Sequence, residues 1–318
     1  MPAYDPRMAA GAHGNRAIYA AFFANLGIAI AKFIGYVITQ SASMLAESIH
    51  SVADTGNQAL LLLGGRRARK EPTELYPFGY GRERYFWSFV VALVLFSLGS
   101  LFAIYEGIHK LEHPEPLESP MVAYVILGIA IVLEAFSLRT AVIESQEAKG
   151  AMSWGTFLRR AKSPELPVVL LEDIGAQCGL FIALGAITVS EVTGNPRWDG
   201  YGTLAIGALL GVIATFLAIE MKGLLIGEAA DPVVHDVIVH AIEDDDDVRR
   251  LIHLRTQHLG PEELLIAGKV EFLDNLSGAE LAGAVNRIEA SIRGVVPIAS
   301  VIYLEPDIHD AERPVTHG

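Results

Sequence analysis

Six long apolar segments constrain the fold of this chain more than any other feature of its sequence. They run approximately over residues 16–39, 41–64, 85–108, 121–143, 167–192 and 201–226. Each is close to the roughly 20 residues that an α-helix needs to cross a bilayer. A mean hydropathy of +0.38 and a hydrophobic share of 52% support the same interpretation. The sequence therefore predicts an all-α bundle of six transmembrane helices.

Basic residues predict how these segments are oriented. The loops after the second and fourth segments are basic, with Arg66, Arg67, Arg69, Lys70, Arg82, Arg84, Lys149, Arg159, Arg160 and Lys162. The loops after the third and fifth segments contain only Lys110 and Arg197. The positive-inside rule then places both termini in the cytoplasm. We expect a multi-pass protein of the plasma (inner) membrane with a cytoplasmic tail over residues 1–15 and a transmembrane domain over 16–228.

A change of composition after Asp231-Pro232 indicates a second domain, expected over 229–306 and followed by a tail over 307–318. Its pattern predicts a helix over 232–241, strands over 249–258, 264–272 and 299–304, and a helix that a capping box opens at Ser277 and Glu280. The order αββαβ is typical of a small two-layer α+β domain of ferredoxin-like type. Its edge strands favour pairing with a second copy.

Charge and cysteine content exclude several functions. The net charge of −13 argues against nucleic acid as a partner. Cys178 is the single cysteine of the sequence, so neither a disulfide framework nor a cysteine-rich zinc site can form within one chain.

The second apolar segment carries Glu47, His50 and Asp54. Ionisable groups inside a bilayer cost at least a few kcal/mol each, so their presence favours a functional role. His50 and Asp54 are four residues apart and therefore lie on one face of a helix, one turn from each other. An imidazole and a carboxylate in this arrangement can share a divalent cation.

The fifth segment contains the adjacent carboxylates Glu172 and Asp173. They lie about 100° apart on a helix, and both can reach a point in front of the line through Val169. With His50 and Asp54 they offer one nitrogen and up to three carboxylates, which suits tetrahedral Zn²⁺ and also admits Mn²⁺ or Fe²⁺. The alternative is a polar network that only holds the bundle together. We expect four further polar residues to line an access path or support the ligands: Glu47, Asn57, Gln177 and Glu134.

At this point the chain resembles the cation diffusion facilitator family of divalent-metal/proton antiporters. Nearly the whole length takes part, and the most specific segments are 45–54 (LAESIHSVAD), 77–81 (PFGYG), 171–173 (LED) and 194–196 (GNP). Together they are similar to the branch that includes zinc transporter nine. The resemblance implies a homodimer in which the cytoplasmic domains meet.

The chain departs from the pattern of this family at three places. Members typically carry a histidine or aspartate where Val169 stands, so Glu172 is the candidate for the fourth ligand. Tyr76 and Tyr80 take positions of a second metal site in the loop, which we therefore expect to be absent. In the cytoplasmic domain His253 matches a family ligand, but its partners are replaced. They correspond to Lys269, Tyr303 and Glu305, so no binuclear zinc cluster is expected there.

These residues suggest metal efflux in exchange for protons. Zn²⁺ would enter from the cytoplasm, bind His50, Asp54 and Asp173, and leave when protons compete for the same ligands on the other side. Zn²⁺ is then the substrate, and no cofactor is expected. Transport of Mn²⁺, Fe²⁺ or a broad range of ions remains an alternative, as does a metal sensor that transports nothing. An intramembrane metalloenzyme is disfavoured because a motif such as HExxH is absent, so we expect no enzyme.

Overall fold

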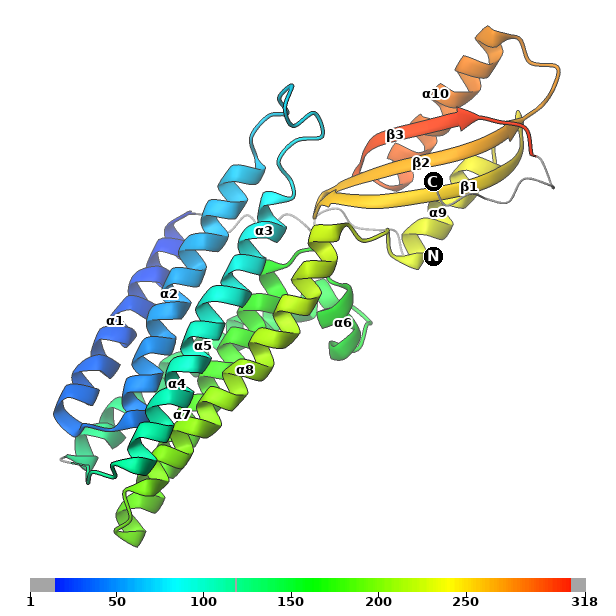
Figure 1. Cartoon of the computed structure of the whole chain (residues 1–318). Coiled ribbons are helices and arrows are strands. Elements are labelled where there is room, and N and C mark those ends of the chain that lie inside the picture. Colours follow the sequence, from blue (N-terminus) through cyan, green and yellow to red (C-terminus); the bar gives the residue numbers. More distant parts are fainter. Residues whose placement is uncertain (1–14, 118, 310–318) are drawn as a thin grey trace. The chain divides into compact units, whose positions relative to one another are not determined.

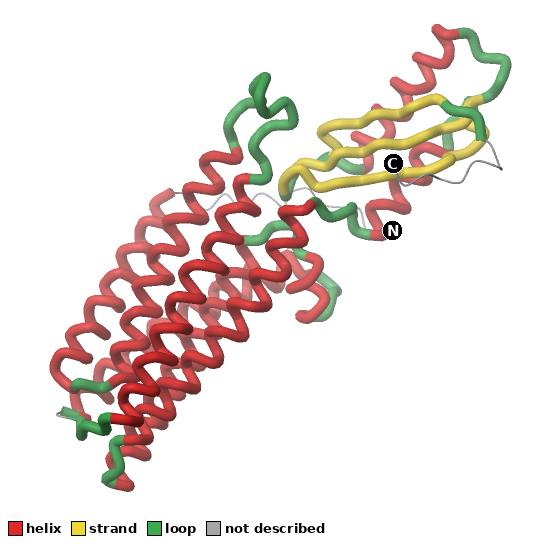
Figure 2. The backbone as a smooth tube through the Cα atoms, in the orientation of Figure 1, coloured by secondary structure: helices red, strands yellow, loops and turns green. Residues whose placement is uncertain are grey.

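The structure, a computed structural model, describes residues 15–117 and 119–309. In this part of the chain, six long helical segments run side by side (Figures 1 and 2). They are α1 (Asn15–Thr39), α2 (Ala42–Ala68), the continuous run of α3 (Glu83–Val90), η2 (Val91–Phe96) and α4 (Ser97–Glu112), α5 (Pro120–Lys149), α7 (Glu165–Thr193) and α8 (Arg197–Ile226). The six predicted segments are thus confirmed as helices. A short helix that the sequence did not predict, α6 (Trp154–Arg160), lies between α5 and α7.

Four of these segments are long and apolar enough to cross a membrane: the run from α3 to α4, α5, α7 and α8. In α1, residues Leu26–Thr39 form a shorter apolar helix. The second helix, α2, has the length but carries buried polar side chains along one face. Large apolar residues are exposed on the outside of the bundle, for example Phe33 on α1 and Phe136 on α5. This apolar surface is the one that a bilayer would cover.

A single carboxylate, that of Asp199, fixes the tight turn between α1 and α2. It is fully buried in the first turn of α8. It accepts hydrogen bonds from the backbone N–H of Ala42 (2.8 Å) and Ser43 (3.3 Å) and from the hydroxyls of Ser41 (2.9 Å) and Ser43 (2.6 Å). One negative charge therefore lies at the N-termini of two helices, where the helix dipole favours it. This contact sets where α2, and the polar residues on it, begin.

Glycines allow the helices to approach closely, as their spacing predicts. A side chain at Gly175 would contact Ile213 of α8, and one at Gly207 would contact Ile104 of α4. At Gly179 on α7, an added Cβ would collide with the carboxylate of Glu47 on α2. The GxxxG spacing of Gly175 and Gly179 thus serves close helix packing.

The C-terminal domain consists of α9 (Pro232–Glu243), β1 (Val248–Gly260), β2 (Glu263–Phe272), α10 (Gly278–Val295) and β3 (Ala299–Pro306). The sheet has the order β1-β2-β3, with β1 antiparallel and β3 parallel to β2. The two helices pack on one face of the sheet (Figure 1). Ile266, Val270 and Phe272 are buried against Ile288 and Ile292 of α10. The predicted αββαβ order and its capping box are both confirmed.

The described chain divides into two compact units. One contains the long helices up to Gly223, and the other contains the chain from Leu224 onward together with the loop Lys70–Arg82. Within this second unit the loop meets the β1–β2 turn, where a Cβ on Gly81 would lie 2.8 Å from the carbonyl oxygen of Leu259. The predicted domain boundaries and the cytoplasmic location of this unit remain predictions.

Candidate metal site

The helix α2 presents His50 and Asp54 on its buried face. The Nδ1 atom of His50 lies 3.4 Å from Oδ1 of Asp54, and the two residues are 2% and 7% exposed. The helix begins at Ser41, whose side chain accepts a hydrogen bond from the N–H of Met44. The sequence prediction that His50 and Asp54 form one pair on one helix face is therefore confirmed in geometry.

Glu172 of α7 faces this pair. Its carboxyl lies next to that of Asp54. Asn57, one turn after Asp54 on α2, donates a hydrogen bond of 3.0 Å to Oε1 of Glu172. The other oxygen, Oε2, is buried and accepts no hydrogen bond in the structure. A free acceptor next to Asp54 is what a cation ligand would present.

Asp173 is directed to a different neighbour. Its Oδ2 accepts a hydrogen bond of 2.9 Å from the hydroxyl of Ser137 on α5. The adjacent carboxylates of α7 therefore face α2 and α5, respectively, and not one common point. Val169, which stands at the expected ligand position, packs on the apolar cluster of Ala141, Phe157 and Leu170 instead.

The remaining predicted polar residues lie around these groups. Glu47 is fully buried one turn before His50, and Lys32 of α1 donates a hydrogen bond of 3.2 Å to its Oε2. Glu134 of α5 lies 3.8 Å from the same ammonium. Gln177, one turn after Asp173 on α7, is buried, and its Oε1 accepts no hydrogen bond.

Among the residues that the structure describes, no group of three or more His, Cys, Asp or Glu side chains is arranged to hold a metal ion. The structure therefore brings His50, Asp54 and Glu172 next to one another without completing a ligand set. That all four predicted residues bind metal together remains a prediction.

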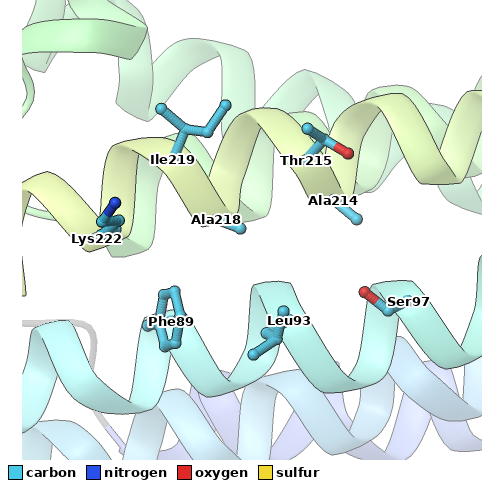
Figure 3. Close-up of a pocket in the computed structure, with 8 residues that line it drawn as sticks. All are labelled: Phe89, Leu93, Ser97, Ala214, Thr215, Ala218, Ile219 and Lys222. Carbon is cyan, nitrogen blue, oxygen red and sulfur yellow. The ribbon is translucent and has the colours of Figure 1, made fainter.

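A separate groove of about 300 Å³ lies on the bundle between the third helical segment and α8 (Figure 3). Phe89, Leu93 and Ser97 line one side, and Ala214, Thr215, Ala218, Ile219 and Lys222 line the other. It is mostly apolar and includes none of the predicted metal ligands.

The structure also describes the residues at the two positions where the family resemblance implies further metal sites, one in the C-terminal domain and one in the loop before α3. His253 on β1 lies opposite Lys269 on β2, which in turn lies opposite Glu305 on β3. The ammonium of Lys269 pairs with Glu305 at 3.1 Å and with Asp307 at 2.7 Å. In the loop, the rings of Tyr76 and Tyr80 pack on each other with centroids 4.9 Å apart. The expectation that neither position binds metal remains a prediction.

Fold and site together define a multi-pass membrane protein with ionisable groups buried in its helical bundle and a small α+β domain at its C-terminal end. The family model of the cation efflux transmembrane domain matches residues 18–226. This chain belongs to the cation efflux family.

Curated relatives agree with this membership. The proton-coupled zinc antiporter SLC30A9, mitochondrial, of Homo sapiens is 34% identical over 244 residues, which are 76% of this chain and 43% of that protein. Metal tolerance protein C4 of Arabidopsis thaliana is 32% identical over 262 residues, 82% of this chain and 57% of that protein. The chain thus spans less than half the length of the first relative. A solved structure of a MamM-CTD variant covers 24% of this chain at 20% identity, with a TM-score of 0.23.

Sequence reasoning did not identify three contacts of the site. These are the contacts of Lys32, Ser137 and Asp199. Ser137 follows Glu134 by three residues on α5, so the two share a helix face. A lysine inside an apolar segment signals a partner of opposite charge, but the sequence does not say which carboxylate it meets.

Proposed function

We propose that this chain transports a divalent metal cation, Zn²⁺ in the first place, across a membrane in exchange for protons by alternating access. The observation that carries the proposal is the buried His50–Asp54 pair on α2, with Glu172 of α7 beside it. Membership of the cation efflux family and the names of the relatives support it.

The donor set suits the proposed ion. An imidazole nitrogen and two or three carboxylates match the ligands that Zn²⁺ takes in proteins. Asp54 and Glu172 each have a buried oxygen that accepts no hydrogen bond in the structure. Asp173, whose Oδ2 accepts a hydrogen bond from Ser137, would join them on leaving that partner. Glu172 and Asp173 thus supply alternatives for the ligand that Val169 lacks.

Proton exchange follows from this ligand chemistry. Metal binding requires a neutral imidazole and ionised carboxylates, so the ion and protons compete for the same atoms. Asp54 and Glu172 place two carboxyl groups next to each other, so both offer atoms at which a proton could replace the metal. Release of the metal to the side with higher proton activity would then leave protons on these ligands.

The test is Zn²⁺ uptake into liposomes with an imposed pH gradient. We expect His50→Ala and Asp54→Ala to reduce the rate at least tenfold, because each removes one ligand of a small set. Val52→Ala is the matched control, since Val52 lies on the same helix and is 58% exposed on the outside of the bundle. Transport by both site variants at the parental rate would refute the assignment.

Flux measurements also separate the alternatives. Competition among Zn²⁺, Mn²⁺ and Fe²⁺ decides between a zinc transporter and a broad-range one. A protein that binds Zn²⁺ with no uptake would be a sensor.

We further propose that the protein is a homodimer. As its membrane we propose the plasma (inner) membrane; SLC30A9 is mitochondrial by name, so localisation needs its own measurement.

A further inference from the structure

Lys32 on α1 is a fully buried basic residue of the helical bundle. Its ammonium donates hydrogen bonds to the hydroxyl of Ser51 at 2.8 Å and to Oε2 of Glu47 at 3.2 Å. Oε1 of Glu134 lies 3.8 Å away. The three oxygens come from α2 and α5, whereas the lysine comes from α1. The ammonium therefore lies within a shell of oxygens from neighbouring helices.

Two carboxylates and a hydroxyl around one point are also a donor set for a hard divalent cation. The cluster has further capacity, because Oε1 of Glu47 is buried and accepts no hydrogen bond. This oxygen is directed toward Gly179 of α7, where no side chain fills the space. The lysine thus occupies the place of an ion in a site that would otherwise offer oxygen ligands to one.

This cluster is next to the candidate metal pair. Glu47 and Ser51 each precede a member of the pair, His50 and Asp54, by three residues on α2, so the two sites are less than one helical turn apart. Two anionic sites at this separation would compete for an entering cation. The ammonium of Lys32 neutralises the site formed by Glu47 and Glu134, and because it is part of the chain it cannot dissociate.

We infer that Lys32 is a resident counter-cation that prevents Glu47 and Glu134 from binding a second divalent ion. Stability alone is a weak reason for the lysine, because buried ion pairs often contribute little and an apolar side chain would avoid the cost of burying charge in a membrane. The binding inference stands apart from the proposed transport; only its consequence, retention of the ion at His50 and Asp54, rests on it.

The experiment counts Mn²⁺ bound to the full-length protein in detergent, from the loss of the free-ion electron paramagnetic resonance signal. Mn²⁺ suits the question because the new site would contain oxygen ligands only. We expect Lys32→Met to bind one more ion per chain than the parent protein. The additional ion should disappear in Lys32→Met combined with Glu47→Gln. Lys32→Arg keeps the charge and should bind the parental number.

The outcomes are distinguishable. An unchanged ion count in a folded Lys32→Met protein would overturn the inference, as would a second ion that persists when Glu47 is also replaced. Lys32→Gln, which retains a donor for Ser51, serves as the second variant, and unfolding of both would show that the lysine is a structural requirement instead. A parent protein that binds no Mn²⁺ while Lys32→Met binds one would exclude Mn²⁺ as an ion of the proposed metal pair and leave this inference standing.

Discussion

Asp199→Ala should destabilise the turn that places α2 in the bundle. Asp199 is fully buried and accepts four hydrogen bonds at the start of α2. Two of the donors are hydroxyls, and that of Ser43 has an alternative partner in Thr203 at 3.1 Å. The other two are the backbone N–H groups of Ala42 and Ser43, which cannot turn away.

The two backbone donors determine how much unfolding free energy Asp199→Ala should lose. Each buried donor that loses its acceptor costs about 1–3 kcal/mol, so we expect a loss of about 2–6 kcal/mol of unfolding free energy. For a chain of 318 residues, an unfolding entropy of about 2.1 cal/mol/K per residue makes 1 kcal/mol correspond to about 1.5 °C in Tm, so Tm should fall by roughly 3–9 °C. Asp199→Asn retains one acceptor oxygen and should give a smaller decrease.

Thermal unfolding of the purified protein in detergent, followed by tryptophan fluorescence, measures this change. Trp198 is the neighbour of Asp199 in the chain and reports on the same turn. Glu191→Ala removes an exposed carboxylate at the end of α7 and is the control. If Asp199→Ala shifted Tm no more than this control, the buried carboxylate would not be what fixes α2.

Two further predictions concern steric fit and pH. Gly179→Ala should lower the unfolding free energy by about 1–3 kcal/mol, because its methyl group would displace Glu47 from Lys32. Gly185→Ala on the same helix has open space around it and should be neutral or stabilising. Equal effects of the two variants in a denaturation assay would contradict this prediction. Burial raises the pKa of Glu263, so folding favours its protonated form, and that contribution is lost as pH rises through the folded pKa. Glu263→Gln should therefore stabilise the protein at pH 8, and the gain should shrink toward pH 5 in the same assay.

Local patterns in the sequence were sufficient for the elements and their buried faces. The period of two along β2 is sufficient to place Ile266, Val270 and Phe272 on the one face that is buried, because alternation along a strand does not depend on its neighbours. The capping box at Ser277 is equally local. The six long segments followed from the thickness of a bilayer, but their ends did not, since α5 continues to Lys149 beyond the expected end at 143.

The contacts within the site could not be predicted in the same way. A helical wheel gives the angle between Glu172 and Asp173 on α7 but not how α7 is rotated against α2 and α5. That rotation directs Glu172 to Asn57 and Asp173 to Ser137. The close approach of α2 and α7 at Gly179 helps to set it, and such an approach between segments far apart in the sequence has no local signal.

Lysines among carboxylates occur in both units of the chain. Hydrogen bonds with Asp307 and Glu305 raise the pKa of Lys269, which keeps its ammonium charged where relatives in the family would place a metal ligand. Lys32 makes a similar arrangement with Glu47 in the bundle. The two differ in one testable respect: Lys269 is partly exposed and water can screen its charges, whereas Lys32 is fully buried. Removal of the Lys32 ammonium should therefore leave the carboxylates of Glu47 and Glu134 without a counter-cation in a place that water cannot screen. For this reason an ion count on the Lys32 variants is more informative than one on Lys269 variants.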